Sequence, residues 1–241
     1  MEDKNLEITI CHLYPKLLNL YGDIGNIKAL KFRAEKRGIK VNLIEVNIGE
    51  DIPNADIYFI GGGQDRQQVD VSNELQKHKE FLTQKRDENK VFLTICGGYQ
   101  LLADYFQTIG GEKLMGISLI SGYTIGGKKR FIGNVTAKTD FLTPDTLVGF
   151  ENHSGRTYLT GDTKPLAKIV VGNGNNGEDM FEGARYKNVF GTYLHGSFLP
   201  KNPHFTDYLI KLALGGEDVE LPHLDDTLEM NAHNSLVGKA Y

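Results

Sequence analysis

"VFLTICGGYQ", residues 91–100, places one of only two cysteines in the chain between two different local patterns. Its first five residues are apolar or β-branched and predict a short buried strand, whereas the residues after the glycines, up to Phe106, predict a helix. Gly97 and Gly98 let the backbone turn sharply between the two elements. Cys96 is therefore expected on a tight turn from a strand into a helix.

The same alternation of strand and helix extends back to the start of the chain. Between Ile24 and Ala34 the apolar residues have helical spacing, and Gly38 follows as a candidate helix end. Strands that alternate with helices in this way usually lie parallel and are joined by right-handed crossovers. We therefore predict an α/β fold of three layers, with an open, mostly parallel sheet flanked by helices. Strands are expected at residues 6–13, 39–46, 56–60 and 91–95, and helices at 23–36 and 67–86.

After residue 115 the chain is expected to add further β-rich segments. Short strands are predicted at residues 116–124, 130–138, 147–152, 167–171 and 189–194, and helices at 202–214 and 228–237. No internal repeat, low-complexity tract or linker interrupts the sequence. Residues 1–241 are therefore expected to form one domain.

Composition narrows the possible partners. A hydrophobic fraction of 40%, a charged fraction of 24% and a net charge of −4 are typical of a soluble globular protein without a nucleic-acid surface. The sequence lacks a signal peptide and any apolar run near the roughly 20 residues that span a bilayer, so no transmembrane segment and a cytoplasmic location are expected. Cys11 is expected to be a small core residue.

Candidate catalytic residues follow the ends of the predicted parallel strands, and these ends share one edge of the sheet. A helix N-terminus stabilises a thiolate at Cys96, which makes it a candidate nucleophile; the alternative is an inert buried cysteine. His195 ends a later strand and could carry the proton, although such a histidine alone is more often structural. Backbone N–H groups of Gly97 and of Gly63, in the run 61–63, could stabilise an oxyanion, or these glycines could simply form turns.

Neither a metal site nor a nucleotide site is predicted in this chain. The seven histidines show no close ligand pair, and no cysteine pair accompanies them. The phosphate-loop pattern G-x-x-x-x-G-K-[ST] is missing, and "IGGKK" at residues 125–129 does not match it. A reaction that needs ATP would therefore require a separate protein.

Several motifs carry a family resemblance. "ICGGYQ" (residues 95–100) resembles the nucleophile turn of class I glutamine amidotransferases, in the CobB/CobQ-like branch of the cobyric acid synthases. Other motifs resemble the glutaminase subunits of lipid II isoglutaminyl synthases, in the same order over nearly the whole chain. They are "LYPKLLNLYGDIGNIKAL" (13–30), "GGGQDRQ" (61–67), "FENHSGRT" (150–157) and "YLHGSFLPKNP" (193–203).

The resemblance implies roles for individual residues. Cys96 would attack the side-chain amide of L-glutamine, His195 would transfer the proton, and Gln100 would contact the substrate. Arg130 would bind the substrate glutamine, for which a guanidinium fork suits the α-carboxylate. Without the resemblance, the basic run of residues 128–130 would be interpreted as a solvated turn.

The resemblance also implies a heterodimer. The partner would be a Mur-ligase homologue of the MurT type that holds ATP and Mg²⁺, with lipid II as the acceptor whose stem-peptide D-glutamate α-carboxyl becomes an amide. One alternative is a glutaminase that serves a different synthetase, such as a cobyrinate-type enzyme. The others are a cysteine hydrolase of similar fold and a non-catalytic binding subunit.

Two positions depart from the wider class. Thr94 replaces the glycine that usually stands two residues before the cysteine, and Ser197 replaces the glutamate that usually stands two residues after His195. A neutral hydroxyl cannot stabilise an imidazolium as a carboxylate does, so the acid is expected elsewhere in the chain or on the partner. Asp23 is expected to cap the first helix, or else to belong to a partner-facing surface.

Overall fold

The computed structural model describes residues 6–63 and 65–240 and has two six-stranded sheets. The first sheet has the order β11-β12-β4-β3-β1-β2, and its strands are parallel except β11, which pairs antiparallel with β12 at the edge. These strands are β1 (Glu7–Leu13), β2 (Lys40–Val46), β3 (Ile57–Ile60), β4 (Val91–Ile95), β11 (Ala184–Tyr186) and β12 (Val189–Thr192). The predicted mostly parallel sheet is confirmed.

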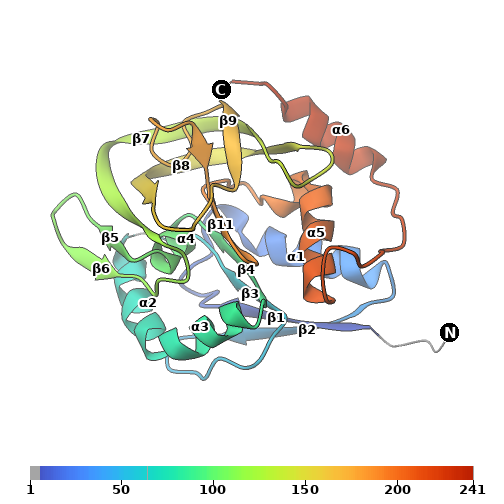
Figure 1. Ribbon diagram of the computed structural model, residues 1–241, viewed down its shortest axis with the longest axis horizontal. Helices are drawn as coiled ribbons and strands as arrows, with labels where there is room; N and C mark the ends of the chain where they lie inside the picture. The colour runs from blue at the N-terminus through green and yellow to red at the C-terminus, as the bar shows by residue number, and fades with distance from the viewer. Residues whose placement is uncertain (1–5, 64, 241) are drawn as a thin grey trace.

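Helices cover both faces of this sheet (Figure 1). On one face, Leu30 and Phe205 pack in a core that also contains Phe59 and Leu93 of the sheet. On the other face, a second core joins helix residues such as Leu75 to the sheet. The first face carries α1 (Ile24–Glu35) and α5 (Pro203–Ala213), and the second carries α2 (Asp65–Lys77), α3 (Lys79–Asp87) and α4 (Gly97–Leu102). The predicted three layers are therefore present.

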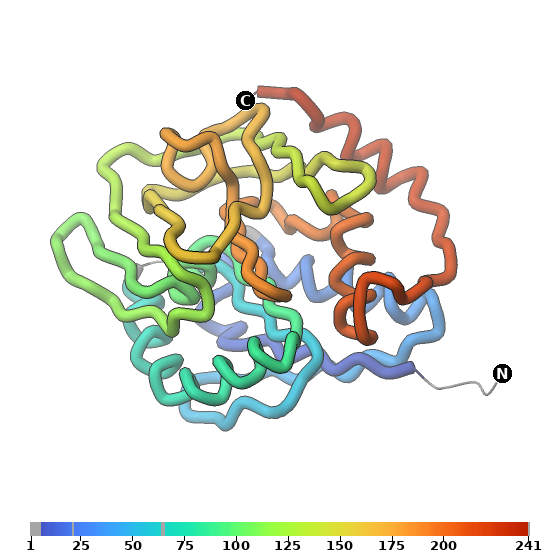
Figure 2. Tube along the Cα trace, in the orientation of Figure 1, coloured from blue at the N-terminus to red at the C-terminus, as the bar shows by residue number. Residues whose placement is uncertain are grey.

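The second sheet is built around one long hairpin, β7 (Gly122–Lys138) and β8 (Thr146–Leu159). The hairpin crosses the upper part of the molecule in the view of Figure 2. The strands predicted at 130–138 and 147–152 are parts of these two longer strands. The sheet is completed by β5 (Tyr105–Gln107), β6 (Lys113–Met115), β9 (Ala167–Val171) and β10 (Phe181–Glu182). The remaining elements are η1 (Leu20–Gly22), η2 (Leu199–Lys201) and α6 (Thr227–Leu236).

The helix after Cys96 is shorter than predicted. It ends at Leu102, and β5 begins at Tyr105, so the expected helix through Phe106 is wrong. The helix ends here because the backbone N–H groups of residues 117–120 donate to the carbonyls of residues 101–103, which satisfies the last carbonyls of the helix. That segment was expected to be a strand, but regular pairing begins only at Gly122.

The single helix predicted at residues 67–86 is also wrong. His78 has φ −104° and ψ 5°, outside the helical region, and separates α2 from α3. Its N–H pairs with the carbonyl of Leu75, three residues back, which tightens the end of α2.

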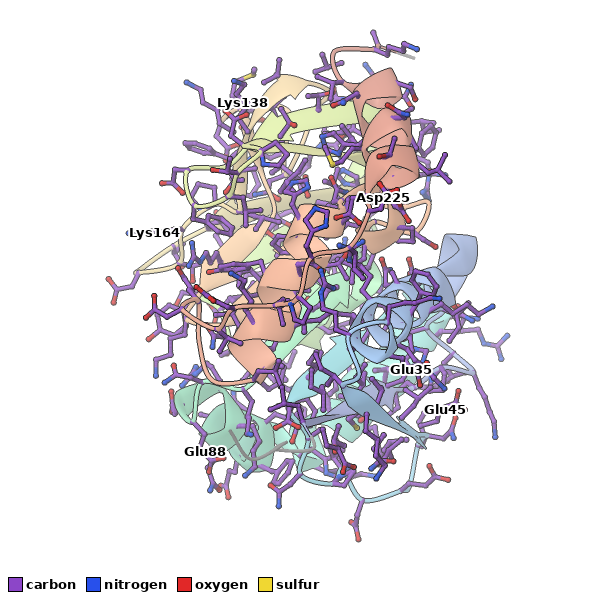
Figure 3. All side chains as sticks on the ribbon, turned by 90° about the vertical axis from the view of Figure 1, so that its right-hand side faces the viewer. Glu35, Glu45, Glu88, Lys138, Lys164 and Asp225 are labelled. Atoms are coloured by element: carbon purple, nitrogen blue, oxygen red, sulfur yellow. The ribbon has the colours of Figure 1, made fainter. Side chains whose placement is uncertain are left out.

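Charged side chains of both signs are spread over the surface, as the labelled examples in Figure 3 illustrate. Glu35 on α1, Glu88 directly after α3 and Lys138 on β7 are all exposed. Over the described ranges, no helix combines the length and the apolar character needed to cross a membrane.

Replacement of a buried phenylalanine is expected to destabilise the helical layer that contains α1 and α5. Phe205 is fully buried, and its ring centroid lies 5.5 Å from that of Phe190 and 5.3 Å from that of Phe198. We expect Phe205→Ala to lower the free energy of unfolding by about 3–5 kcal/mol, because burial is lost and a cavity remains. Phe32→Ala, at a position 52% exposed, should change it by less than about 0.5 kcal/mol. If urea denaturation showed the same loss of unfolding free energy in Phe205→Ala and Phe32→Ala, this assignment of the core would be contradicted.

Candidate active site

Cys96 lies in a strained turn at the end of β4. Its backbone has φ 50° and ψ −105°, a region that residues other than glycine rarely adopt. The turn brings α4 against the end of β3, because a Cβ on Gly98 would lie 2.8 Å from the carbonyl oxygen of Gly61. Only glycine allows this approach. The turn leaves the Cys96 side chain half-buried at the upper edge of the sheet.

His195 approaches Cys96 from the neighbouring strand. It follows β12, which pairs in parallel with β4, and its backbone is held by a hydrogen bond from its N–H to the carbonyl of Phe150. Burial lowers the pKa of His195, but the Cys96 thiolate, the hydrogen bonds to Asp23 and Cys96 and the Asp23 charge raise it to about 10. Because the shift is upward, the imidazole remains protonated at neutral pH and loses its proton only as the pH rises towards 10.

Asp23 does not cap α1 with its side chain, so this expectation is wrong. Asp23 occupies the N-cap position, but its side chain makes no capping hydrogen bond; Asn19 Oδ1 instead accepts the N–H of Ile24 at 2.8 Å. The fully buried Asp23 carboxylate points inward: Oδ2 accepts the N–H of Gly62 at 2.6 Å, and Oδ1 lies 3.9 Å from His195 Nδ1. An acid of this chain therefore lies beside the histidine.

Ser197, at the position where the wider class has its acid, supports the same turn. Its Oγ donates to the carbonyl of Gly22 at 2.7 Å. The contact is close, since a Cβ on Gly25 would lie 2.1 Å from Ser197 Oγ.

The two predicted oxyanion donors lie together. A Cβ on Gly97 would be 3.1 Å from the backbone nitrogen of Gly63, so these two peptide groups are neighbours. The N–H of Gly62 is already donated to Asp23, which makes Gly63 the better candidate in this run. Gln68 holds the loop, because its Nε2 donates to the carbonyl of Gly63 at 3.3 Å.

A cleft of about 640 Å³ contains most of the predicted site residues. Gln100 donates from Nε2 to the Tyr193 hydroxyl at 3.0 Å, and the Tyr193 ring stacks on His153 with centroids 3.6 Å apart. Exposed Arg130 reaches the cleft from β7, where its Nη1 donates to Asn152. The cleft is lined by Leu20, Gly63, Arg66, Gln68, Cys96, Gln100, Phe106, Arg130, Asn152, His153, Ser154 and Gly155.

Sequence reasoning missed two contributions to this site. Arg66, at the start of α2, adds a second cation to the wall, and residues 152–155 of β8 form the side next to Arg130. The pairing of Phe131 with His153 in the hairpin explains why the basic run and the "FENHSGRT" motif meet. The sequence signal that could have placed the basic run beside this motif was the pairing of the predicted strands 130–138 and 147–152 in a hairpin.

Comparison with known proteins agrees with this geometry. A model of the CobB/CobQ-like glutamine amidotransferase domain matches residues 9–203. The chain belongs to this family.

This amidotransferase covers nearly the whole length of some relatives and only part of others. It is 44% identical to the lipid II isoglutaminyl synthase (glutamine-hydrolyzing) subunit GatD of Staphylococcus aureus, over 97% of this chain and 96% of that one. Its identity to the cobyric acid synthase of Caldanaerobacter subterraneus is 30%, over 73% of this chain but only 37% of that protein. The solved structure of PurLQS from Thermotoga maritima superposes with a TM-score of 0.56, at 16% identity and over 95% and 99% of the two chains, which shows a shared fold.

A side chain at Gly62 is expected to disturb the amidotransferase site. Its Cβ would lie 3.1 Å from His195 Cε1, 3.3 Å from Asp23 Oδ2 and 3.4 Å from Cys96 Cβ. Because misplacement of reacting groups costs up to about 100-fold in rate, we expect Gly62→Ala to slow glutamine hydrolysis about 10- to 100-fold. Gly110→Ala is the control, since its Cβ would meet only Thr108 Oγ1 at 3.8 Å. Wild-type hydrolysis by Gly62→Ala would contradict this geometry.

Proposed function

We propose that this amidotransferase is the glutaminase subunit of a lipid II isoglutaminyl synthase. It hydrolyses L-glutamine through a thioester on Cys96 and delivers the ammonia to a synthetase subunit. The observation that carries the proposal is that the parallel strands β4 and β12 bring Cys96 and His195 together at the edge of a cleft that also contains Gln100 and Arg130. The correspondence with the GatD subunit over nearly both whole chains supports the choice of this synthetase over a cobyrinate-type one.

The cleft has groups that can bind both the α-carboxylate and the side-chain amide of glutamine. The Arg130 fork binds the α-carboxylate, and the positive charge of Arg66 favours the same anion. Gln100 already donates from Nε2 to Tyr193, so its carbonyl oxygen is the atom that accepts a hydrogen bond from the substrate. The side-chain amide then points towards Cys96.

The first half of the reaction forms a thioester. The Cys96 thiolate attacks the side-chain carbonyl carbon, and the resulting oxyanion accepts hydrogen bonds from the N–H groups of Gly97 and Gly63. When the carbon–nitrogen bond breaks, His195 gives its proton to the departing nitrogen, which leaves as ammonia. The high pKa of His195 keeps that proton available while the sulfur is a thiolate.

The second half regenerates the enzyme. Neutral His195 takes a proton from water as the water oxygen attacks the thioester carbonyl. The new tetrahedral intermediate uses the same two backbone donors, and its collapse breaks the carbon–sulfur bond. Glutamate leaves, and the thiolate and imidazolium pair is restored.

The ammonia acceptor belongs to another protein in this proposal. Amide formation from a carboxylate needs activation by ATP, and the sequence contains no phosphate loop for it. A Mur-ligase homologue of the MurT type supplies the ATP and Mg²⁺ site and binds lipid II, whose D-glutamate α-carboxyl is amidated. The need for ATP puts this heterodimer in the cytoplasm.

Loss of the nucleophile should abolish glutamate formation. We expect Cys96→Ala to lower the rate at least about 10³-fold, both alone and with the co-expressed Mur-ligase-like partner, because no thioester can form. Cys11→Ala is the matched control: Cys11 is fully buried on β1, and burial raises its thiol pKa to about 12, so it should retain the wild-type rate. Glutamate formation by Cys96→Ala would contradict the proposal.

Loss of the arginine fork should weaken glutamine binding. A lysine ammonium cannot reproduce the bidentate grip on a carboxylate, so we expect Arg130→Lys to raise KM for glutamine at least about tenfold, or about 1.4 kcal/mol. Lys128→Ala, at an exposed position of the same run, should leave KM unchanged. An unchanged KM in Arg130→Lys, measured by initial rates of glutamate release, would remove Arg130 from the binding site.

A further inference from the structure

We infer that Gln68 is a positioning residue for the two backbone groups that stabilise the oxyanion. Its side-chain amide, carried by α2, lies between Gly63 and Gly97 and fixes the distance between their N–H groups. This inference rests on the proposed function, because it assigns Gln68 a role in glutamine hydrolysis. The side chain lines the cleft and is 2% exposed, and the proposed reaction does not otherwise use it.

The backbone conformations of Gly63 and Gly97 do not require glycine. Neither residue has a positive φ, so a residue with a side chain could adopt either backbone. Neighbouring side chains exclude a Cβ instead. A Cβ on Gly97 would lie 2.5 Å from Gln68 Nε2 and 3.1 Å from Gln68 Cδ, and a Cβ on Gly63 would overlap Leu18 Cδ2. The glycine at position 97 therefore makes room for the Gln68 amide.

Hydrogen bonds hold the loop on both sides of the Gly63 N–H. The peptide group that carries this N–H begins with the carbonyl of Gly62, which accepts the N–H of Leu20 at 3.1 Å. The next carbonyl, that of Gly63, accepts a hydrogen bond from Gln68 Nε2 at 3.3 Å. This second bond is long, and hydrogen bonds in active sites often shorten when substrate binds. Leu20 and Gln68 together limit the rotation of the peptide groups around Gly63.

The oxygen of the Gln68 amide has no such support. Oε1 is buried and has no hydrogen-bond partner among residues 6–63 and 65–240. A buried acceptor without a partner costs free energy, so stability alone would favour an apolar side chain at this position. Because the oxygen is buried, it is also not available to substrate. A polar side chain at such a position indicates a role in function rather than in stability.

The two oxyanion donors need a link because they lie on separate segments. The pairing of β3 with β4 ends at Ile60 and Thr94, before either glycine. Donors stabilise an oxyanion best when they already lie about 2.7–3.1 Å from its position, and glycine backbones change such a spacing easily. The Gln68 amide contacts both Gly63 and Gly97, so it keeps the two donors in place before the substrate arrives.

The first test compares Gln68→Met with Gln76→Ala in the complex with the Mur-ligase-like partner. Methionine keeps the volume of the side chain but cannot donate to Gly63. We expect kcat for glutamine hydrolysis to fall about 10- to 100-fold and KM to stay within about twofold, because the donors act in the transition state. Gln76, on the same helix, donates from Nε2 to the carbonyls of Met115 and Gly116. Gln76→Ala therefore controls for loss of a side-chain contact of α2 and should keep the wild-type kcat.

Two inhibitors separate oxyanion stabilisation from the reactivity of the sulfur. The carbonyl carbon of an aldehyde analogue of glutamine bonds reversibly to the Cys96 sulfur, and its oxygen becomes an oxyanion. Iodoacetamide alkylates the same sulfur with loss of iodide and forms no oxyanion. In Gln68→Met we expect the inhibition constant of the aldehyde to rise about 10- to 100-fold and the alkylation rate to stay within about twofold.

A third measurement does not depend on glutamine. Gly97→Ala places a methyl group against the Gln68 amide, so we expect it to lower the melting temperature. The fall should be smaller in a Gln68→Ala background, because the obstructing side chain is gone and the two changes are coupled. If the wild type hydrolyses no glutamine, the proposed function fails, while these melting temperatures still test the contact between Gln68 and Gly97.

Four results would overturn the inference. They are a wild-type kcat in Gln68→Met, a rise in KM that accounts for the whole loss of activity, a fall in alkylation rate equal to the fall in kcat, and additive melting-temperature losses in the double variant. The second would make Gln68 a substrate contact, and the third would indicate a general disturbance of the site. If Gln68→Met does not fold, Gln68→Glu, which keeps the shape but lacks the donor, takes its place in the same comparisons.

Discussion

The left-handed backbone of Cys96 is the constraint on which the site depends. A non-glycine residue in such a conformation costs about 1–3 kcal/mol and persists only where the surrounding structure enforces it. Here the packing of Gly98 against the end of β3 enforces it. The same contact brings the glycine loop after β3 next to the sulfur, while the parallel pairing of β4 with β12 brings His195 from the other side.

Charge is arranged in two separate parts around this turn. Inside, Cys96, His195 and Asp23 lie in a row, and the buried Asp23 carboxylate lies beside the His195 imidazolium, so these two groups compensate each other's charge. On the cleft wall, Arg66 and Arg130 provide positive charge that has access to solvent and suits an anionic group of a small substrate. In the proposed reaction, the first part activates the sulfur, and the second binds the α-carboxylate of glutamine.

The sequence predicted the parallel sheet and the meeting of Cys96 with His195 because both depend on local signals. Apolar strands that stop at glycine or a polar residue are easily recognised, and parallel pairing brings their ends together. The inward position of the Asp23 carboxylate could not be predicted, since a helix-capping acid and a buried one look the same in sequence; only the contact with Gly62 distinguishes them. The early end of α4 depends on backbone hydrogen bonds from residues 117–120, which no local pattern reveals.

The central claim is that Cys96 is the nucleophile towards the side-chain carbonyl of glutamine. Its most direct test is to treat the complex with a diazoketone analogue of glutamine, which alkylates an attacking thiolate, and to locate the adduct by peptide mass spectrometry. We expect one adduct, on Cys96, whose formation is slowed by L-glutamine and lost in His195→Ala. An adduct on another residue, or labelling of Cys96 that glutamine does not slow, would contradict the account.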